Sequence, residues 1–288
     1  MQSSRQSAGR GPQSPAHPAH PAHPAHPALV ALALSLVSCS AAPGSSPEAA
    51  QRSIGEYDLA RDAFQRGQLR EALDHVQKSL DLDEENGDAA YLGAITLLAF
   101  CAAVEDPKAS TDCRLKDAER FARQALEVNP EMRDAKNTLG VILVHQGRYD
   151  EAVEVLKPLA NDILYASPEN AWGNLGWAYL LRGNIDEAID ALRRSVAAQP
   201  LFCVGQYRLG LAYEKKGEPA LAREALTKAV ETQRPDCQRL QDAFDARARV
   251  AIKLGQADEA RADLLRCRDI GASTRVGQRC AVQLRSLQ

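Results

Sequence analysis

The residues best suited to metal or nucleophilic chemistry in this sequence are its seven cysteines and six histidines. No Cys-x-x-Cys pair occurs, and only His75 and His145 lie outside the amino-terminal Pro-Ala-His run, so the spacing of a zinc site is missing. The two histidines have no serine or cysteine arranged beside them as a nucleophile, and there is no glycine-rich phosphate loop. The sequence therefore predicts a protein that is not an enzyme and uses no metal, cofactor or small-molecule substrate.

Apart from Cys39, six cysteines are present, an even number that favours disulfides in an exported chain. The first pair brackets one loop, the second occupies the starts of neighbouring repeats, and the third would join a terminal helix to the helix before it. The proposed pairs are Cys101 with Cys113, Cys203 with Cys237, and Cys267 with Cys280. The alternative is that some of these residues are free buried thiols.

Residues 1–38 have the features of an export signal. The apolar stretch Ala28–Val37 is too short to span a bilayer but suits the core of a signal peptide. It runs into Leu-Val-Ser-Cys ending at Cys39, which resembles a bacterial lipobox, and this resemblance implies cleavage before Cys39 and acylation of that residue. Ser40 then implies sorting to the outer membrane, with residues 39–52 as the lipidated end and its linker.

Two other interpretations of this segment stay open. The signal could be a plain secretory one, in which case Cys39 is incidental. The long stretch before the apolar core also suggests a translation start downstream of Met1. Each interpretation exports the protein.

Charge and composition narrow the class of the remaining chain. The 288 residues include 35 Lys+Arg and 38 Asp+Glu, and a formal net charge of −3 gives no basic surface for nucleic acid. Alanine is abundant while aromatic residues make up 5%, which favours closely packed helices over a β-sandwich or barrel. We therefore expect an all-α protein without strands.

The strongest internal pattern is a repeat of 34 residues. Leu175-Gly176 and Tyr179 recur as Leu209-Gly210 and Tyr213, and further glycines, alanines and leucines recur with them. This combination at this period resembles the tetratricopeptide repeat (TPR), in which two antiparallel helices meet at a glycine turn. The resemblance implies an α-solenoid, a right-handed superhelix of helix-turn-helix units.

Weaker copies of the pattern extend the array to six units and a capping helix. The expected units are 53–86, 87–132 with an insertion at 101–116, 133–168, 169–202, 203–240 and 241–274, followed by the cap at 275–288. Pro158 is expected to kink the second helix of the third unit, and the linker Asn161–Pro168 is two residues longer than in the family.

Such an array is expected to bind protein on the concave face that the first helices of TPR units form. The predicted groove residues are Asn137, Val141, Val144, Trp177, Leu180, Leu181, Tyr207 and Leu211. This set is largely apolar and lacks the lysines and asparagines with which other TPR modules hold a carboxylate, so it suits a hydrophobic or amphipathic segment. The alternative for Trp177 is that it only packs between neighbouring repeats.

The lipobox, the linker and the six repeats together resemble the type IV pilus biogenesis lipoproteins of the PilF/PilW/Tgl type. The segments Asp134–Ala152, Glu169–Tyr179 and Pro200–Gly210 carry the resemblance beyond the general TPR pattern. It implies a pilotin in the outer membrane that binds secretin subunits and promotes their assembly into the pore for the pilus, and hence twitching or gliding motility. An open alternative is a periplasmic TPR adaptor lipoprotein that scaffolds envelope enzymes such as peptidoglycan hydrolases through exposed, charged surfaces.

Overall fold

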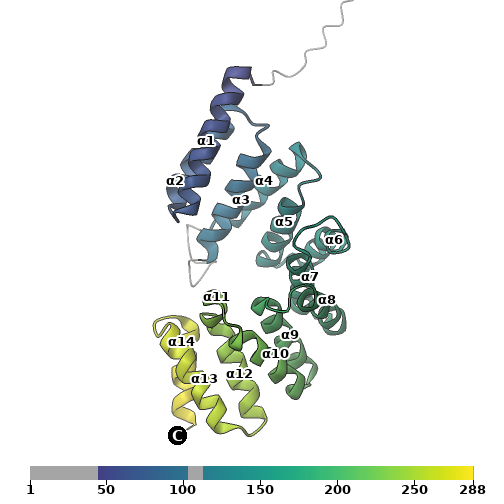
Figure 1. The fold of residues 1–288 in the computed structure, drawn as a ribbon, viewed down its shortest axis with the longest axis vertical. Coiled ribbons are helices and arrows are strands. Elements are labelled where there is room, and N and C mark those ends of the chain that lie inside the picture. Colours follow the sequence, from purple (N-terminus) through teal and green to yellow (C-terminus); the bar gives the residue numbers. More distant parts are fainter. Residues whose placement is uncertain (1–44, 103–112, 288) are drawn as a thin grey trace, which may run out of the picture. The chain divides into compact units, whose positions relative to one another are not determined.

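The computed structural model describes residues 45–102 and 113–287, and every regular element within them is an α-helix (Figure 1). The expected all-α class is confirmed. The export signal, Cys39 and the middle of the insertion lie outside the described residues. No helix in the described ranges combines the length and the apolar character needed to cross a bilayer.

The described helices form six antiparallel pairs in chain order (Figure 1). The first helices of the pairs are α1 (Pro47–Gln65), α3 (Gly87–Ala102), α5 (Arg133–His145), α7 (Pro168–Arg182), α9 (Cys203–Lys216) and α12 (Gln241–Lys253). The second helices are α2 (Leu69–Leu82), α4 (Leu115–Val128), α6 (Tyr149–Ala160), α8 (Ile185–Ala198), α10 (Pro219–Glu231) and α13 (Ala257–Ile270). The single turn α11 (Pro235–Gln238) precedes the sixth pair, and α14 (Arg275–Ser286) packs on α12 and α13 as a cap.

Glycine makes the turn inside five of the six pairs. These residues adopt a left-handed backbone that side-chain-bearing residues rarely take, and Gly183, for example, has a φ of 100°. The other four are Gly67, Gly147, Gly217 and Gly255. The recurrence of glycine in the sequence therefore has a direct conformational cause.

Leucine and alanine fill the space between the helices. Most repeats bury large aliphatic side chains completely, and alanines with no exposed surface surround them, so the helices approach closely. The fully buried leucines are Leu97, Leu143, Leu156, Leu175, Leu192, Leu226 and Leu264. The repeat unit is thus a pair of helices whose apolar faces are covered by each other and by the next pair.

The two kinds of helix differ in how they meet their neighbours. Each first helix contacts the first helix of the next unit, from α1 with α3 to α9 with α12. Second helices in the described residues make no comparable contact with one another. The side of the array formed by the first helices is therefore the more closely packed one, and we call it the first-helix face.

Two local features differ from the sequence-based expectation. Helix α1 begins at Pro47, inside the expected linker, because the Ser46 side chain accepts a hydrogen bond from the Ala49 amide and Pro47 occupies the first helical position. Pro158 lies in the last turn of α6, which ends two residues later at Ala160. The proline therefore stands where the helix terminates rather than in its middle.

Three disulfides join Cys101 to Cys113, Cys203 to Cys237 and Cys267 to Cys280. They are the pairs that the sequence favoured. The first joins the end of α3 to the residues before α4, the second ties α11 to the start of α9, and the third fixes the cap α14 to α13. The second and third bonds hold the two elements that lie outside the regular helix pairs.

Candidate protein-binding groove

A groove of about 380 Å³ opens on the first-helix face between α7, α9 and α12. Its floor and walls are mainly apolar, and three charged side chains stand at its border. The lining residues are Trp177, Leu180, Leu181, Leu211, Glu214, Lys215 and Lys253. We call this site the tryptophan groove.

The structure brings four of the eight predicted groove residues together here, namely Trp177, Leu180, Leu181 and Leu211. Leu181 is the exposed leucine of this site, with 36% of the residue accessible to solvent. Leu180 also borders the groove although it is almost fully buried. The apolar part of the site is therefore concentrated on the fourth and fifth units.

The other four predicted residues do not line this groove. Val144 is buried in the core and presents little surface, while Val141 and Tyr207 are half-buried. Tyr207 packs against the two core clusters of the carboxyl-terminal half. Asn137 is half-buried on α5 and takes part in a polar row along the same face.

Trp177 has both of the roles that the sequence left open. It packs against the core cluster of the first four units and against that of the fourth to sixth units, so it joins neighbouring repeats. It also lines the tryptophan groove. Its half-buried indole is thus part of the packing and part of the surface that a partner would meet.

A row of polar side chains crosses the first-helix face beside the groove. Asn174 Nδ2 of α7 donates to Asn137 Oδ1 of α5 over 3.0 Å. Arg208 Nη1 of α9 donates to Asn174 Oδ1 over 2.8 Å and to the Gly173 carbonyl over 3.1 Å. The Arg208 guanidinium also lies over the Trp177 ring, 5.3 Å from its centre.

The expectation that the groove pattern lacks lysines and asparagines has to be corrected, because Lys215 and Lys253 line the groove and Asn174 bonds to Asn137 beside it. Asn174 and Arg208 were missed because the repeat phase selected the positions directly before them, such as Tyr207, as the inward ones. A signal was present, since Asn137, Asn174 and Arg208 occupy nearly equivalent positions of three successive units, 37 and 34 residues apart.

The lining of the tryptophan groove includes two lysines and one acid, Lys215, Lys253 and Glu214. Burial lowers the pKa of Arg208 to about 10, so the guanidinium keeps its proton at neutral pH. Partial desolvation and the charge of Arg208 together lower the pKa of His145 on α5. Burial alone would raise the pKa of Glu214, but hydrogen bonds from Lys253 and Arg249 outweigh it and hold that pKa below its usual range. The acid at the groove border is thus already neutralised by two cations.

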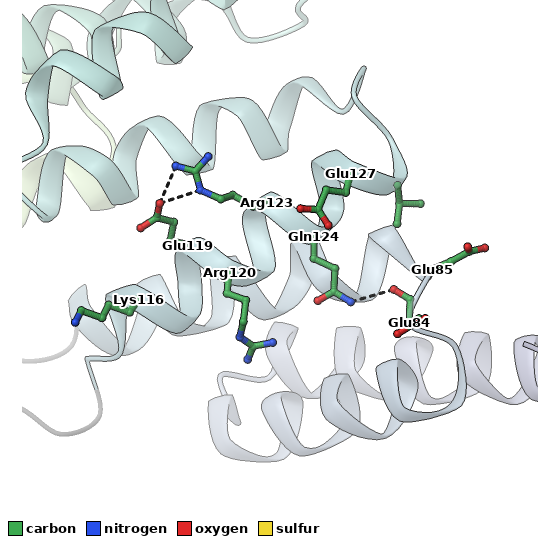
Figure 2. A pocket seen from close by; sticks show the side chains of 9 residues that line it. Glu84, Glu85, Lys116, Glu119, Arg120, Arg123, Gln124 and Glu127 are labelled. Atoms are coloured by element: carbon green, nitrogen blue, oxygen red, sulfur yellow. Dashed lines mark hydrogen bonds and ion pairs between the residues drawn. The ribbon is translucent and has the colours of Figure 1, made fainter. Parts of the chain in front are cut away.

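A second, larger hollow of about 950 Å³ lies over α4 and the loop before α3 (Figure 2). It is lined by both acidic and basic side chains. The lining residues are Glu84, Glu85, Lys116, Glu119, Arg120, Arg123, Gln124, Glu127 and Val128. Arg123 pairs with Glu119 at 2.7 Å, and Gln124 Nε2 donates to the Glu84 carbonyl over 3.0 Å. This surface is polar and suits recognition by charge.

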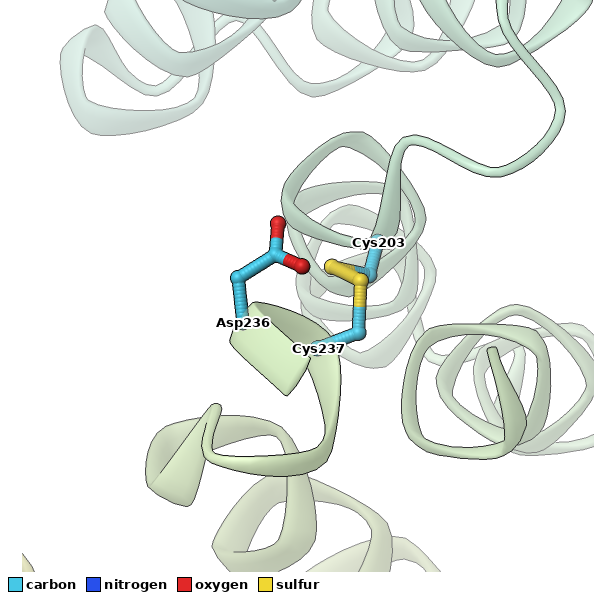
Figure 3. A group of neighbouring side chains, drawn as sticks. All are labelled: Cys203, Asp236 and Cys237. Atoms are coloured by element: carbon cyan, nitrogen blue, oxygen red, sulfur yellow. A yellow bond between two sulfur atoms is a disulfide. The ribbon is translucent and has the colours of Figure 1, made fainter. Parts of the chain in front are cut away.

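Six of the cysteines and His75 have structural partners in the described part of the chain. Asp236 stands close to the sulfurs of Cys203 and Cys237, but Figure 3 shows those sulfurs bonded to each other, so they offer no thiolate to a metal. The same holds for the cluster of Asp245 with the third disulfide. His75 Nδ1 lies 2.6 Å from Glu56 Oε2.

Comparison with protein families agrees with the helix pairs. Models of the tetratricopeptide repeat match residues 55–78, 131–200 and 205–236. The type IV pilus assembly protein PilF of Pseudomonas aeruginosa is 27% identical over 153 residues, which are 50% of this chain and 55% of that protein. The matched region thus spans about half the length of the curated relative.

Solved structures share the fold over most of the chain. PilW, a widely conserved type IV pilus biogenesis factor, aligns with a TM-score of 0.65 and 21% identity over 80% of this chain and 98% of its own. PilF of Pseudomonas aeruginosa aligns with a TM-score of 0.62 and 19% identity, over 82% of this chain and 99% of its own. A chain of the Cut9–Hcn1 assembly of the APC/C aligns with a TM-score of 0.66 and 15% identity, over 82% of this chain but only 42% of its own. At these identities the likeness shows a TPR array and no more, because very different assemblies use it.

Proposed function

Because the chain is a tetratricopeptide repeat protein with homology to the type IV pilus assembly protein PilF, we propose that it acts in type IV pilus biogenesis as a pilotin. In this role it is a lipoprotein of the outer membrane, faces the periplasm, and binds secretin subunits through its first-helix face. Binding promotes assembly of the secretin pore, on which twitching or gliding motility depends.

The observation that carries the proposal is the tryptophan groove. A solenoid without a partner gains no stability from leaving Leu181 partly exposed beside Trp177 and Leu211. A helix or extended segment of a partner would bury these side chains, and burial of apolar surface is worth about 25 cal/mol per Å². An apolar groove therefore fits a subunit that must be held before it inserts into a membrane.

The anchor is proposed from the sequence Leu36-Val-Ser-Cys39. Two or more acyl chains on Cys39 would hold the protein on a bilayer stably. In Cys39→Ala the protein is expected to lose fatty-acid labelling and to leave the outer-membrane fraction. A variant that still labels and still fractionates with the outer membrane would remove this part of the proposal.

The groove is tested best by Leu181→Glu. The change places a charge where the partner's apolar surface would sit, so secretin binding is expected to weaken roughly tenfold or more. Because Leu181 is partly exposed, the free energy of unfolding should change by no more than about 0.5 kcal/mol. The readouts are secretin multimers in cell envelopes and the thermal melt of the same variant.

Leu221→Glu is the matched control, since Leu221 lies on the second helix α10 and is similarly exposed at 39%. It should leave secretin assembly unchanged. Normal secretin multimers in Leu181→Glu, with both variants folded, would exclude the tryptophan groove as the secretin site. Trp177→Ala is a poorer test, because this residue also packs against two core clusters.

The charged hollow over α4 favours a second candidate, an adaptor lipoprotein that scaffolds envelope enzymes such as peptidoglycan hydrolases. Folded enzymes are commonly recognised through complementary charge. Reversal of charge at Arg120 and Lys116 should then abolish hydrolase capture and spare secretin assembly. If the protein captures secretin but no hydrolase from crosslinked envelopes, and the charge reversals leave this capture unchanged, the result favours the pilotin.

A further inference from the structure

The loop between α6 and α7 presents two large aliphatic side chains to solvent. Ile163 is 95% exposed and Leu164 is 72% exposed, the highest values among the large hydrophobic residues of the described ranges. The loop holds them in place, because Asp162 accepts a hydrogen bond from the Leu164 amide over 2.9 Å and pairs with Arg133 at 2.7 Å. Tyr165, directly after them, is buried. We call Ile163 and Leu164 the loop tip.

A hollow of about 730 Å³ lies at the next connection, between α8, α9 and α10. Part of its lining is an apolar wall at the end of α8 and in the loop that follows. This wall consists of Val196, Ala197, Pro200 and Leu201, and Leu201 is 56% exposed. No residue that lines this hollow also lines the tryptophan groove. We call it the loop-end hollow.

A buried polar side chain without a partner faces this hollow. Gln206 of α9 is 6% exposed and lines the hollow, yet its side-chain amide makes no hydrogen bond to any residue that the structure describes. A buried amide in this state costs free energy. Its oxygen accepts and its nitrogen donates, which are the two functions that pair with a backbone peptide group. The hollow is therefore completed by a ligand that brings both apolar side chains and a peptide backbone.

The hollow and the loop carry opposite charge. Three basic residues line the hollow against one acid, Glu231, and two of the three pair with exposed acids that do not line it. The basic residues are Arg193, Lys228 and Arg234. Residues 161–169, which contain the loop tip, include Asp162 and Glu169 and no basic residue. Complementary charge of this kind favours the approach of the loop to the hollow of another molecule.

The loop tip and the loop-end hollow lie on one edge of the array. Both belong to connections from a second helix to the next first helix, and antiparallel pairs place all such connections at the same end. The Ser195 hydroxyl of α8 donates to the Glu169 carbonyl of α7 over 2.7 Å and so links the two neighbouring connections. The tip is too exposed to fill the hollow of its own chain. An isologous contact needs both features on one surface, and this edge supplies them.

We propose that the protein associates with a second copy of itself through this edge, with the loop tip of each copy in the loop-end hollow of the other. The two aliphatic side chains then contact Leu201 and the rest of the apolar wall. The Gln206 amide pairs with the backbone of the tip, where the Ile163 amide and carbonyl make no hydrogen bond to the described residues. The contact leaves the tryptophan groove open and does not depend on the proposed function.

The first test is the mass of the purified full-length protein by sedimentation velocity over a range of concentrations. A dimer is expected to form as the concentration rises. Leu164→Arg should raise its Kd roughly tenfold or more, because the change removes apolar surface and sets a cation against the basic lining. Lys228→Glu in the same chain should recover part of this loss. Val282→Arg, at a 57% exposed position of α14, is the matched control and should leave the Kd unchanged.

A photoactivatable amino acid at Ile163 identifies what the tip contacts. Nitrogen-15-labelled and unlabelled protein are mixed and irradiated, and crosslinked peptides that join a labelled to an unlabelled chain are mapped by mass spectrometry. The tip is expected to crosslink to residues 193–206 or 228–234 of the other copy. Gln206→Leu keeps a side chain of similar size without the amide, and should weaken the dimer although it adds apolar surface.

Three results would overturn the proposal. One is a protein that stays monomeric at every concentration. Another is a dimer that Leu164→Arg leaves intact while the thermal melt shows the variant folded, because the contact then lies elsewhere. The third is a tip that crosslinks in cells to lipid or to another protein and never to a second copy.

Discussion

Gly176 of α7 and Leu192 of α8 pack so closely that a Cβ atom on Gly176 would lie 2.5 Å from Leu192 Cγ and 3.2 Å from the Ala188 carbonyl oxygen. Gly210 stands in the same relation to Leu226 in the next unit. Because both the leucine and the backbone would have to move, Gly176→Ala should lower the free energy of unfolding by about 1–3 kcal/mol. Chemical denaturation measures this directly.

Gly55 supplies the opposite case for the same substitution. It lies within α1, and a Cβ there would meet nothing within 4 Å. Gly55→Ala should therefore stabilise the protein by about 0.5–1 kcal/mol, because alanine loses less backbone entropy in a helix. If alanine changed the free energy of unfolding equally at Gly55 and Gly176, the close packing of the two helices would not be the reason for glycine at Gly176.

Asp245 of α12 holds the carboxyl-terminal cap. Its carboxylate is 1% exposed and accepts hydrogen bonds from Arg249 and, over 2.9 Å, from Arg279 Nη2 of α14. Asp245→Ala leaves Arg279 without this acid and Arg249 with Glu214 alone, and should lower the free energy of unfolding by about 1–3 kcal/mol, seen as a lower unfolding midpoint. Asp258→Ala, an exposed acid in the first turn of α13, should cost less than about 1 kcal/mol.

The disulfide between Cys203 and Cys237 tethers α11 across a separation of 34 residues. Replacing both cysteines with serine should reduce stability by about 2–4 kcal/mol, since the unfolded chain gains freedom. Peptide mapping without reductant should find this bond and the two others in the purified protein. Two or more free thiols among these six cysteines would contradict the pairing.

Much of the fold could be predicted from the sequence because the residues that define it recur together. Gly183 and Gly217 mark turns at one period, and Leu175 with Leu192 marks the core between two helices. The start of α1 was missed, although Ser46-Pro47 is a helix amino-terminal signal that the sequence contains.

The candidate site was less predictable. The repeat phase gives the direction of a side chain but not its depth, so Val144 was expected in the groove and is buried. Asn174 and Arg208 have no apolar periodicity, and their relation becomes visible only when neighbouring first helices are set side by side.

Glu119 of α4 links the second and third units through a network that depends on pH. Burial alone would raise its pKa, but hydrogen bonds from Arg148, Arg123 and Gln146 lower the pKa to about 2. Because the folded pKa lies below the unfolded value, this group stabilises the protein above about pH 4.5 and loses that contribution as the pH falls toward 2. Glu119→Gln should thus be less stable than the unaltered protein at neutral pH, by about 1–3 kcal/mol.

The quantity to measure is the difference in stability between Glu119→Gln and the unaltered protein. Other acids titrate in both proteins, so their effects cancel in this difference. Thermal melts between neutral pH and about pH 2 should show the gap narrowing as Glu119 is protonated in the unaltered protein. Glu127→Gln, an exposed residue on the same helix, is the control and should track the unaltered protein throughout. A gap that stays constant down to acidic pH would mean that Glu119 contributes through packing rather than through its charge.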